Sequence, residues 1–355
     1  MKKYIAIGLV AVMAIGGFIY KDKVIMYWYG RATTLNTTNV TILVPKEATI
    51  EILAEKLLVL KVIDDKASFL KVALMKELSG DRLAKGKFRV EPHTNYRTLC
   101  NGFTINANGN GNAEVEVNVT FNNCIDLEDI GGKIAKDLDV DSAAFYAYIT
   151  DPSTLKKYDF TLERMPAMFL PNTYQMFYDT DIPTFVDRMA KEFKKFWTPE
   201  RMAKIKKIGL TSPSDVSTLA SIVYQEQSRN AEEWPLIAGL YLERVKKGMR
   251  LQSDPTFRFC WPDKLKGVER LLNEHRERDC AYNTYLHDGL PPGPICVPPP
   301  AVVEAVLNAE MKGYLFMCAK ADYSGLHDFT VGYPEHAANA VKFQAWLAEE
   351  LRNRN

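Results

Sequence analysis

The sequence predicts an α+β protein with an N-terminal transmembrane helix, small α+β modules and a mixed, helix-rich C-terminal domain. Three observations support this fold class. An uncharged apolar run stands near the N-terminus, a strand–helix–helix pattern occurs twice, and helical periodicities broken by loop-rich stretches fill the second half. A chain of 355 residues, 47% hydrophobic and 25% charged, is typical of several compact units.

The apolar run Tyr4–Tyr20 contains no charged residue, and Lys2 and Lys3 precede it. Its length is at the short end for a helix that crosses a bilayer. The segment Met26–Tyr29 adds aromatic residues of the kind found at membrane interfaces. A cleaved signal peptide is the alternative, but no small-x-small cleavage site follows the run. We therefore expect a retained single-span anchor, and both interpretations export the rest of the chain.

Residues 41–174 show one pattern twice: a strand, two helices and a short extended segment. Asp65 and Asp141 each open the second helix of a copy, 76 positions apart. The other predicted elements are Thr41–Val44, Ile50–Leu60 and Gly86–Pro92 in the first copy, and Val115–Phe121, Leu127–Leu138 and Met168–Tyr174 in the second. The Gly- and Asn-rich loop Asn106–Asn112 would join two small α+β modules. Chance similarity between two α+β units is the alternative.

The remainder of the chain combines long helices with irregular loops. Helical spacing of apolar residues extends from Pro183 to Gly248, and a loop-rich stretch runs from Leu251 to Pro300. A final helix, strand and helix are predicted over Ala301–Lys312, Tyr314–Ala319 and Ala337–Leu351. Loops carried on a rigid scaffold are where binding sites usually lie.

Charge and cysteine content narrow the possible partners and cofactors. A formal net charge of +1 provides no basic surplus for phosphate backbones, so nucleic acid is not a predicted partner. The six cysteines form no CxxC pair and have no histidine at zinc-ligand spacing, so no metal site is predicted. Buried free thiols are the favoured interpretation. If a disulfide forms, Cys260 and Cys280, which flank one loop-like segment, are the best candidates.

One glutamate lies on the apolar face of a predicted helix. Ser212 is suited to cap this helix and Pro213 to its first turn. Glu226 then follows Leu219 at i+7, on the stripe that also contains Ile222 and Val223. A carboxyl group held there loses hydration, which raises its pKa and suits it to protonate a glycosidic oxygen. The alternative is that Glu226 lies at the helix end and reaches into water.

The loops after this helix gather polar and aromatic side chains. Aromatic rings could contact sugar faces, and amides and hydroxyls could bind hydroxyl or acetamido groups, so a saccharide groove is one interpretation. The candidate substrate-binding residues are Gln252, Ser253, Asp254, Tyr282, Asn283, Thr284, Tyr285, Pro291, His327 and His336. The alternative is a set of structured turns that need Pro and Gly for backbone reasons. No Ser/His/Asp elbow and no phosphate-binding Gly loop is visible.

Several segments, in the same order, resemble blocks of the YceG-like (MltG-type) endolytic murein transglycosylases. The resemblance runs along nearly the whole chain and is strongest from about Pro213 to Trp346. The matching blocks are Phe169–Tyr174 (FLPNTY), Leu219–Glu226 (LASIVYQE), Gly248–Thr256 (GMRLQSDPT), Ala281–Tyr285 (AYNTY), Gly289–Gly293 (GLPPG) and Ile295–Pro298 (ICVP), with His327 and His336 at late histidine positions. Glu226 falls at the position of the family's catalytic glutamate.

The resemblance implies a single-pass inner-membrane protein with a LysM-like module before a periplasmic catalytic domain. It implies lytic cleavage of MurNAc–GlcNAc β-1,4 bonds within glycan strands, with Glu226 as acid and then base and 1,6-anhydro-MurNAc ends as products. No metal or other cofactor is required. The implied partners are peptidoglycan strands and the peptidoglycan synthesis machinery, whose nascent strands the cut would terminate. The predicted boundaries are 1–30 for the anchor and juxtamembrane segment, 39–105 for the LysM-like module, 113–178 for the second α+β module and 179–355 for the transglycosylase domain.

The sequence departs from the family pattern at a few positions. Tyr224 stands where a glutamate is common, which leaves Glu226 as the one glutamate of its motif, and Glu243 and Pro299 replace a usual Asn and Gly. Two further hypotheses stay open. The protein could be a hydrolase in which Asp254 acts as a second carboxylate that activates water. It could also be a membrane-tethered, peptidoglycan-binding scaffold without catalysis.

Overall fold

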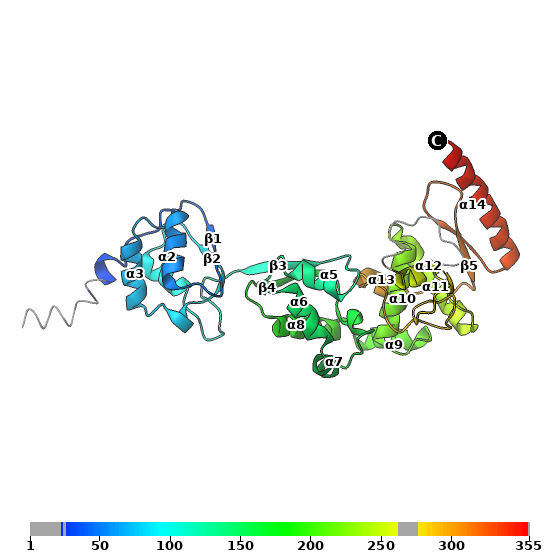
Figure 1. Cartoon of the computed structure of the whole chain (residues 1–355), viewed down its shortest axis with the longest axis horizontal. Coiled ribbons are helices and arrows are strands. Elements are labelled where there is room, and N and C mark those ends of the chain that lie inside the picture. The colour runs from blue at the N-terminus through cyan, green and yellow to red at the C-terminus, as the bar shows by residue number, and fades with distance from the viewer. Residues whose placement is uncertain (1–22, 24–25, 262–275, 354–355) are drawn as a thin grey trace, which may run out of the picture. The chain divides into compact units, whose positions relative to one another are not determined.

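The computed structural model describes residues 23, 26–261 and 276–353. It is a mixed α+β structure in which two-stranded sheets stand among many helices (Figure 1). The predicted transmembrane segment, Tyr4–Tyr20, lies outside the described residues. Within those residues, no helix combines the length and apolar character that a bilayer crossing requires.

The chain divides into two compact units. The first contains the described residues up to Val119 together with Asp137–Asp139 and Tyr174–Thr180, and the second contains the rest. Strands β3 (Glu116–Phe121) and β4 (Asn172–Phe177) contribute residues to both units. The module boundaries predicted from the sequence stay predictions.

The first unit is built on an antiparallel strand pair. Its elements are β1 (Val40–Val44), α2 (Ile50–Val59), α3 (Lys66–Met75), η1 (Gly80–Arg82), β2 (Gly86–Val90) and α4 (Tyr96–Gly102). The register pairs Val40 with Val90 and Val44 with Gly86. Alternation along β1 buries Ile42 and Val44 against the helices, as expected for a strand with one covered face.

The second copy has the predicted strand and two helices, but a third helix and a short 3-10 helix precede its second strand. It runs through β3, α5 (Leu127–Ile134), α6 (Ser142–Thr150), α7 (Pro152–Tyr158), η2 (Met165–Met168) and β4. In each copy the two strands pair with each other. Asp65 and Asp141 cap the second helix of their copies by accepting backbone N–H bonds, so these two predicted helix starts are confirmed.

Four phenylalanine rings form the core beside α6. Phe121, Phe145, Phe169 and Phe185 meet edge to face, with ring centroids 5.9 Å to 6.4 Å apart. This is the arrangement that aromatic quadrupoles favour. The rings come from β3, α6, the segment after η2 and α8 (Ile182–Phe196), and they join these elements into one core.

The remaining elements include one largely buried helix, Pro213–Glu226. They are α9 (Pro199–Lys207), α10 (Pro213–Glu226), η3 (Ala231–Glu233), α11 (Trp234–Lys246), α12 (Asp254–Phe259), α13 (Pro300–Leu307), β5 (Phe316–Ala319), β6 (His327–Thr330) and α14 (Tyr333–Asn353). α10 packs against α11 and α13, and α14 packs on the β5–β6 hairpin (Figure 1).

The helix predicted over Ala301–Lys312 ends earlier, at Leu307. The chain then leaves the helix, and the Glu310 amide donates to the Pro235 carbonyl at 2.9 Å. Gly239 lies under this segment, where an added Cβ would stand 2.1 Å from the Glu310 carbonyl oxygen. The close approach to α11 therefore overrides the helical periodicity of the sequence.

Cys260 and Cys280 form a disulfide. The favoured free-thiol interpretation is therefore wrong for this pair. The interpretation is confirmed for Cys100, Cys124 and Cys296, which are buried free cysteines. Burial raises the pKa of the Cys100 thiol to about 12 and that of Cys296 to about 11, so both stay protonated and unreactive near neutral pH.

Candidate active site

Helix α10 places Glu226 at its C-terminal end. The Ser212 hydroxyl accepts from the Asp215 amide at 3.1 Å, and Pro213 occupies the first turn, as the sequence predicted. Nine residues between Ser214 and Val223 are buried, so the helix is fixed in the core. The helical backbone ends before Gln227, which is extended, so Glu226 is the last helical residue.

Two hydroxyl groups hold the half-buried carboxyl group of Glu226. Tyr241 on α11 donates to Glu226 Oε1 at 2.7 Å, and Ser253, which precedes α12, donates to the same oxygen at 2.5 Å. Burial raises the pKa of Glu226, and the negative charge of Asp254 acts in the same direction. The two hydroxyls and His327 oppose this rise. The result is a carboxyl group that keeps its proton to higher pH than an exposed glutamate does.

Glu226 opens into a cavity of about 460 Å³. This volume is in the range of small-molecule sites. The structure brings five of the predicted site residues together here, namely Glu226, Gln252, Asp254, Tyr285 and His336. Polar and aromatic side chains that the sequence did not single out complete the lining, namely Tyr241, Arg244, Arg276, Phe316 and Tyr333.

The loop before α12 presents Gln252 and Asp254 to this cavity. Gln252 has a left-handed backbone with φ of 51°, and its backbone N–H donates to the Thr284 carbonyl at 3.1 Å. A non-glycine residue in this conformation is uncommon and is often found at functional sites. Asp254 Oδ1 accepts from the Tyr285 hydroxyl at 2.5 Å, and Arg276 lies 3.5 Å from the same oxygen. Asp254 is thus held in a defined orientation beside the cavity.

Other predicted site residues lie behind the cavity wall or outside it. Asn283 and Thr284 are buried. The Asn283 side chain donates to the Arg276 carbonyl and accepts from the Tyr285 N–H, and the Thr284 N–H donates to Thr256 Oγ1. These hydrogen bonds fix the segment that carries Tyr285. Pro291 is buried. Tyr282 lines a second cavity, described below, which does not include Glu226. Tyr282 and Tyr285, which lie three residues apart in one turn, therefore face different cavities.

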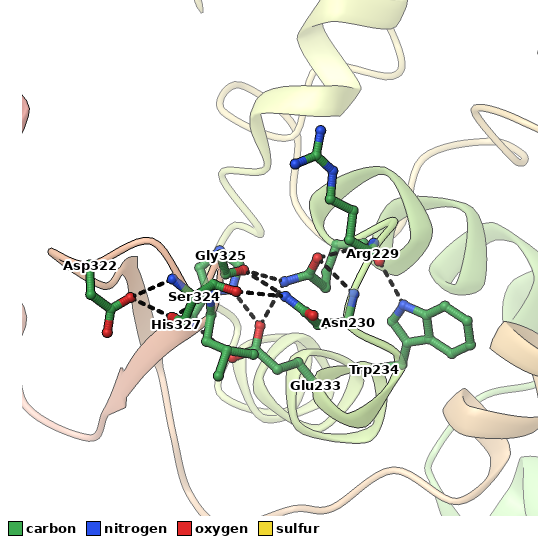
Figure 2. Close-up of polar contacts among 10 residues, drawn as sticks. Arg229, Asn230, Glu233, Trp234, Asp322, Ser324, Gly325 and His327 are labelled. Atoms are coloured by element: carbon green, nitrogen blue, oxygen red, sulfur yellow. Dashed lines mark hydrogen bonds and ion pairs between the residues drawn. The ribbon is translucent and has the colours of Figure 1, made fainter. Parts of the chain in front are cut away.

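His327 belongs to a polar network at the end of α10 (Figure 2). Buried Glu233 is its centre: Oε1 accepts from the His327 amide at 2.7 Å, and Oε2 lies 2.8 Å from His327 Nδ1. The Gln227 amide group donates to Glu233 Oε2 at 2.9 Å and to the Gly325 carbonyl at 2.8 Å. We call Gln227, Asn230, Glu233, Gly325 and His327 the Glu233 network. It fastens the β5–β6 hairpin to the residue that follows Glu226.

The cavity wall opposite α10 combines a buried cation and stacked rings. Arg244 on α11 is 8% exposed and donates to the carbonyl groups of Leu315, Arg250 and Leu251. The imidazole of His336 stacks on Phe316, with ring centroids 5.3 Å apart. Burial and the charge of Arg244 lower the pKa of His336, so its ring is neutral near pH 7. Arg244 thus ties the residue before β5 to α11, and the His336–Phe316 stack ties α14 to β5.

Tyr241 and Arg244 are two of the site residues that the sequence did not single out. Both lie on the face of α11 that also carries buried Ile237 and Ala238, at helical spacing. An arginine and a tyrosine within an apolar stripe were the available signal, because such groups need buried partners. Within the described ranges, no three His, Cys, Asp or Glu side chains converge as the ligands of a metal ion would.

Comparison with known proteins assigns the family. Residues 42–342 match the model of the YceG-like family, which is most of the chain. The chain belongs to the YceG-like family. A YceG-like protein of Listeria monocytogenes shares the fold, with a TM-score of 0.54 and 22% identity over 85% of this chain and 99% of that one.

Two relatives of this YceG-like chain are named endolytic murein transglycosylases. The Bacillus subtilis (strain 168) protein is 31% identical over 165 residues, which are 46% of this chain and 44% of that protein. The Streptococcus pneumoniae serotype 2 (strain D39 / NCTC 7466) protein is 27% identical over 194 residues, 54% of this chain and 33% of that protein. The matched segments therefore span less than half of either relative.

Proposed function

We propose that this YceG-like protein is a lytic transglycosylase that cuts peptidoglycan glycan strands internally. The observation that carries the proposal is Glu226: a carboxyl group with a raised pKa, held by Tyr241 and Ser253, facing a cavity of about 460 Å³. A protonated carboxyl group at neutral pH is what glycosidic bond cleavage requires of its acid. The relatives' names agree with this chemistry.

The proposed reaction uses Glu226 twice. Its proton passes to the glycosidic oxygen of a MurNAc–GlcNAc β-1,4 bond as the bond between that oxygen and C1 of MurNAc breaks. The MurNAc 6-hydroxyl then attacks C1, and its proton passes to the Glu226 carboxylate. The products are a 1,6-anhydro-MurNAc end and a GlcNAc end with a free 4-hydroxyl, and Glu226 is protonated again. Tyr241 and Ser253 stabilise the carboxylate between the two proton transfers.

Asp254 has a supporting role in this proposal. Its carboxylate borders the same cavity and is oriented by Tyr285 and Arg276. A negative charge there stabilises the positive charge that develops at C1 in the transition state. The same carboxylate is what a hydrolase would use to activate water, so hydrolysis is the second candidate function. Both candidates require Glu226 as the acid, and they differ in the chain end produced.

The finer features of the proposal come from the sequence. Tyr4–Tyr20 anchors the protein in the inner membrane and leaves the body on the periplasmic side. Residues 39–105 form a LysM-like module that keeps the enzyme on peptidoglycan. Cutting close to the membrane, beside the synthesis machinery, terminates the elongation of nascent strands.

The test is product analysis with matched variants of the full chain. Uncrosslinked strands are incubated with the wild type, with Glu226→Gln and with Glu232→Gln, which alters an exposed carboxylate outside the cavity. Mass spectrometry of the fragments is expected to show new internal 1,6-anhydro ends for the wild type and Glu232→Gln, and none for Glu226→Gln. Reducing ends would favour the hydrolase, and cleavage by Glu226→Gln would contradict the role of Glu226.

A further inference from the structure

A second cavity, of about 270 Å³, lies in the same compact unit as Glu226. Aromatic rings of Tyr146, Phe259 and Tyr282 line it. Three carboxylate side chains, Asp126, Glu128 and Glu163, also line it, and none of the described residues around it is basic. This combination of ring faces and negative charge differs from the lining of the Glu226 cavity, which contains two arginines.

Two short segments each contribute residues to both cavities. Helix α12 begins at Asp254, on the Glu226 cavity, and ends at Phe259, on the second cavity. Five helical steps separate these residues by about 8 Å along the axis. The turn that carries Tyr282 and Tyr285 likewise gives one ring to each cavity. The second cavity therefore borders the same helix and the same turn as the Glu226 cavity, on other faces of both.

The aromatic pair of the second cavity is held in place. The rings of Phe259 and Tyr282 are 4.6 Å apart between centroids. The disulfide between Cys260 and Cys280 joins the two segments next to this pair. Gly293 packs so closely on Glu163 that an added Cβ would stand 1.9 Å from the Glu163 carbonyl oxygen. The cavity is therefore formed without a ligand and needs little rearrangement to bind one.

The chemistry of the lining defines the ligand. Hydrogen bonds from its own backbone and from Thr161 lower the pKa of Glu163, which stays ionised. Burial and the charge of Glu163 raise the pKa of Tyr282 to about 12, so that ring stays neutral. Ile125 and Leu162 expose 66% and 44% of their surfaces at the rim. Ionised carboxylates beside neutral rings favour an ammonium group on an aliphatic chain.

We propose that the second cavity binds the amine-bearing side chain of a peptide stem on the glycan strand that is cut at Glu226. The proposal rests on peptidoglycan being the substrate, since its stems carry a diamino acid with a free ammonium group. Sugar hydroxyls can donate to these carboxylates but bring no positive charge to balance them, and a stem carboxylate would be repelled. Charge complementarity therefore selects the stem amine as the occupant, and Tyr282 is a specificity residue away from the cleavage point.

Direct binding tests this proposal without requiring cleavage. The probe is a disaccharide-tetrapeptide with a free diamino-acid amine, and its matched control is the same compound acetylated on that amine. We expect titration calorimetry with the full chain to give an affinity about five- to tenfold higher for the free amine, which is the sum expected of one cation–π contact and exposed ion pairs. Equal affinities, or binding of neither compound, would overturn the proposal.

Three variants locate the effect. Glu163→Gln and Tyr282→Leu are expected to bring the affinity ratio close to one, while Glu226→Gln leaves the ratio unchanged because it lies in the other cavity. Loss of the ratio in Glu226→Gln would mean that the amine is bound at the Glu226 cavity, which contradicts the proposal. Failure of strand cleavage by the wild type would count against the proposed function instead, since the binding ratio does not depend on catalysis.

Discussion

Replacing Tyr241 with phenylalanine removes one hydroxyl group from the candidate active site and keeps the ring in the core. This hydroxyl donates to Glu226 Oε1 at 2.7 Å, and Tyr241 is only 2% exposed. The bond stabilises the ionised form of Glu226 and opposes the rise that burial causes in its pKa. Its removal therefore makes Glu226 a weaker acid, which retains its proton to still higher pH.

The size of the effect follows from the partners that remain. A hydrogen bond to a charged group contributes about 1.5–3 kcal/mol. Ser253 still donates to the same oxygen, so the lower figure applies. About 1.4 kcal/mol is a factor of ten in an ionisation equilibrium. We expect the alkaline limb of the profile of kcat/KM against pH to move upward by about one pH unit.

The assay is strand cleavage by the wild type and by Tyr241→Phe across pH 5 to about 9, where the free enzyme's acid determines the alkaline limb. Tyr224→Phe is the matched control, because Tyr224 is close to Glu226 in sequence but donates its hydroxyl to Asn123 Oδ1 at 2.9 Å. Its profile is expected to overlay that of the wild type. An alkaline limb that stays in place or moves downward in Tyr241→Phe would refute the reasoning.

Three further predictions concern stability. Since burial raises the pKa of Glu226, ionising this carboxyl group destabilises the folded protein. The destabilisation is absent below the ordinary glutamate pKa and grows as pH rises. Glu226→Gln should therefore raise Tm at pH 8 and leave it unchanged near pH 4 in thermal unfolding. Glu233→Gln replaces one of the two oxygens that accept from the Gln227 side chain and the His327 N–H by an NH2 group. We therefore expect a loss of about 1–3 kcal/mol in chemical denaturation and faster amide exchange at His327; an unchanged exchange rate would contradict this. Gly293→Ala places a Cβ against the Glu163 carbonyl and should lower Tm by several degrees, whereas Gly132→Ala, which meets open space, should not.

Local signals in the sequence predicted the helix that carries the site. Ser212 and Pro213 specified where α10 begins, and the apolar stripe through Leu219 and Val223 predicted that Glu226 faces inward. These signals depend on neighbours within one helix, which sequence spacing reports directly. The strand–helix–helix–strand order of the first copy was predicted for the same reason, whereas α7 of the second copy was not.

Contacts between distant segments could not be predicted in this way. The pairing of Tyr241 with Glu226 depends on how α11 packs against α10, and spacing within α11 shows only that Tyr241 faces a core. The turn of Tyr282 and Tyr285 appeared as one aromatic block, but its backbone directs the two rings into different cavities. The sequence named Cys260 and Cys280 as the best candidate pair, but only the folded loops bring their Cα atoms to 6.1 Å, within disulfide range.

The most direct test of the account is cleavage of uncrosslinked strands in water enriched in oxygen-18. In the proposed reaction the 6-hydroxyl of MurNAc attacks C1, and Glu226 takes its proton, so no oxygen from solvent enters the product. We predict new 1,6-anhydro ends without the heavy isotope from the wild type and no new ends from Glu226→Gln. Reducing MurNAc ends that contain oxygen-18 would contradict lytic chemistry, and unlabelled anhydro ends from Glu226→Gln would contradict the assignment of the acid.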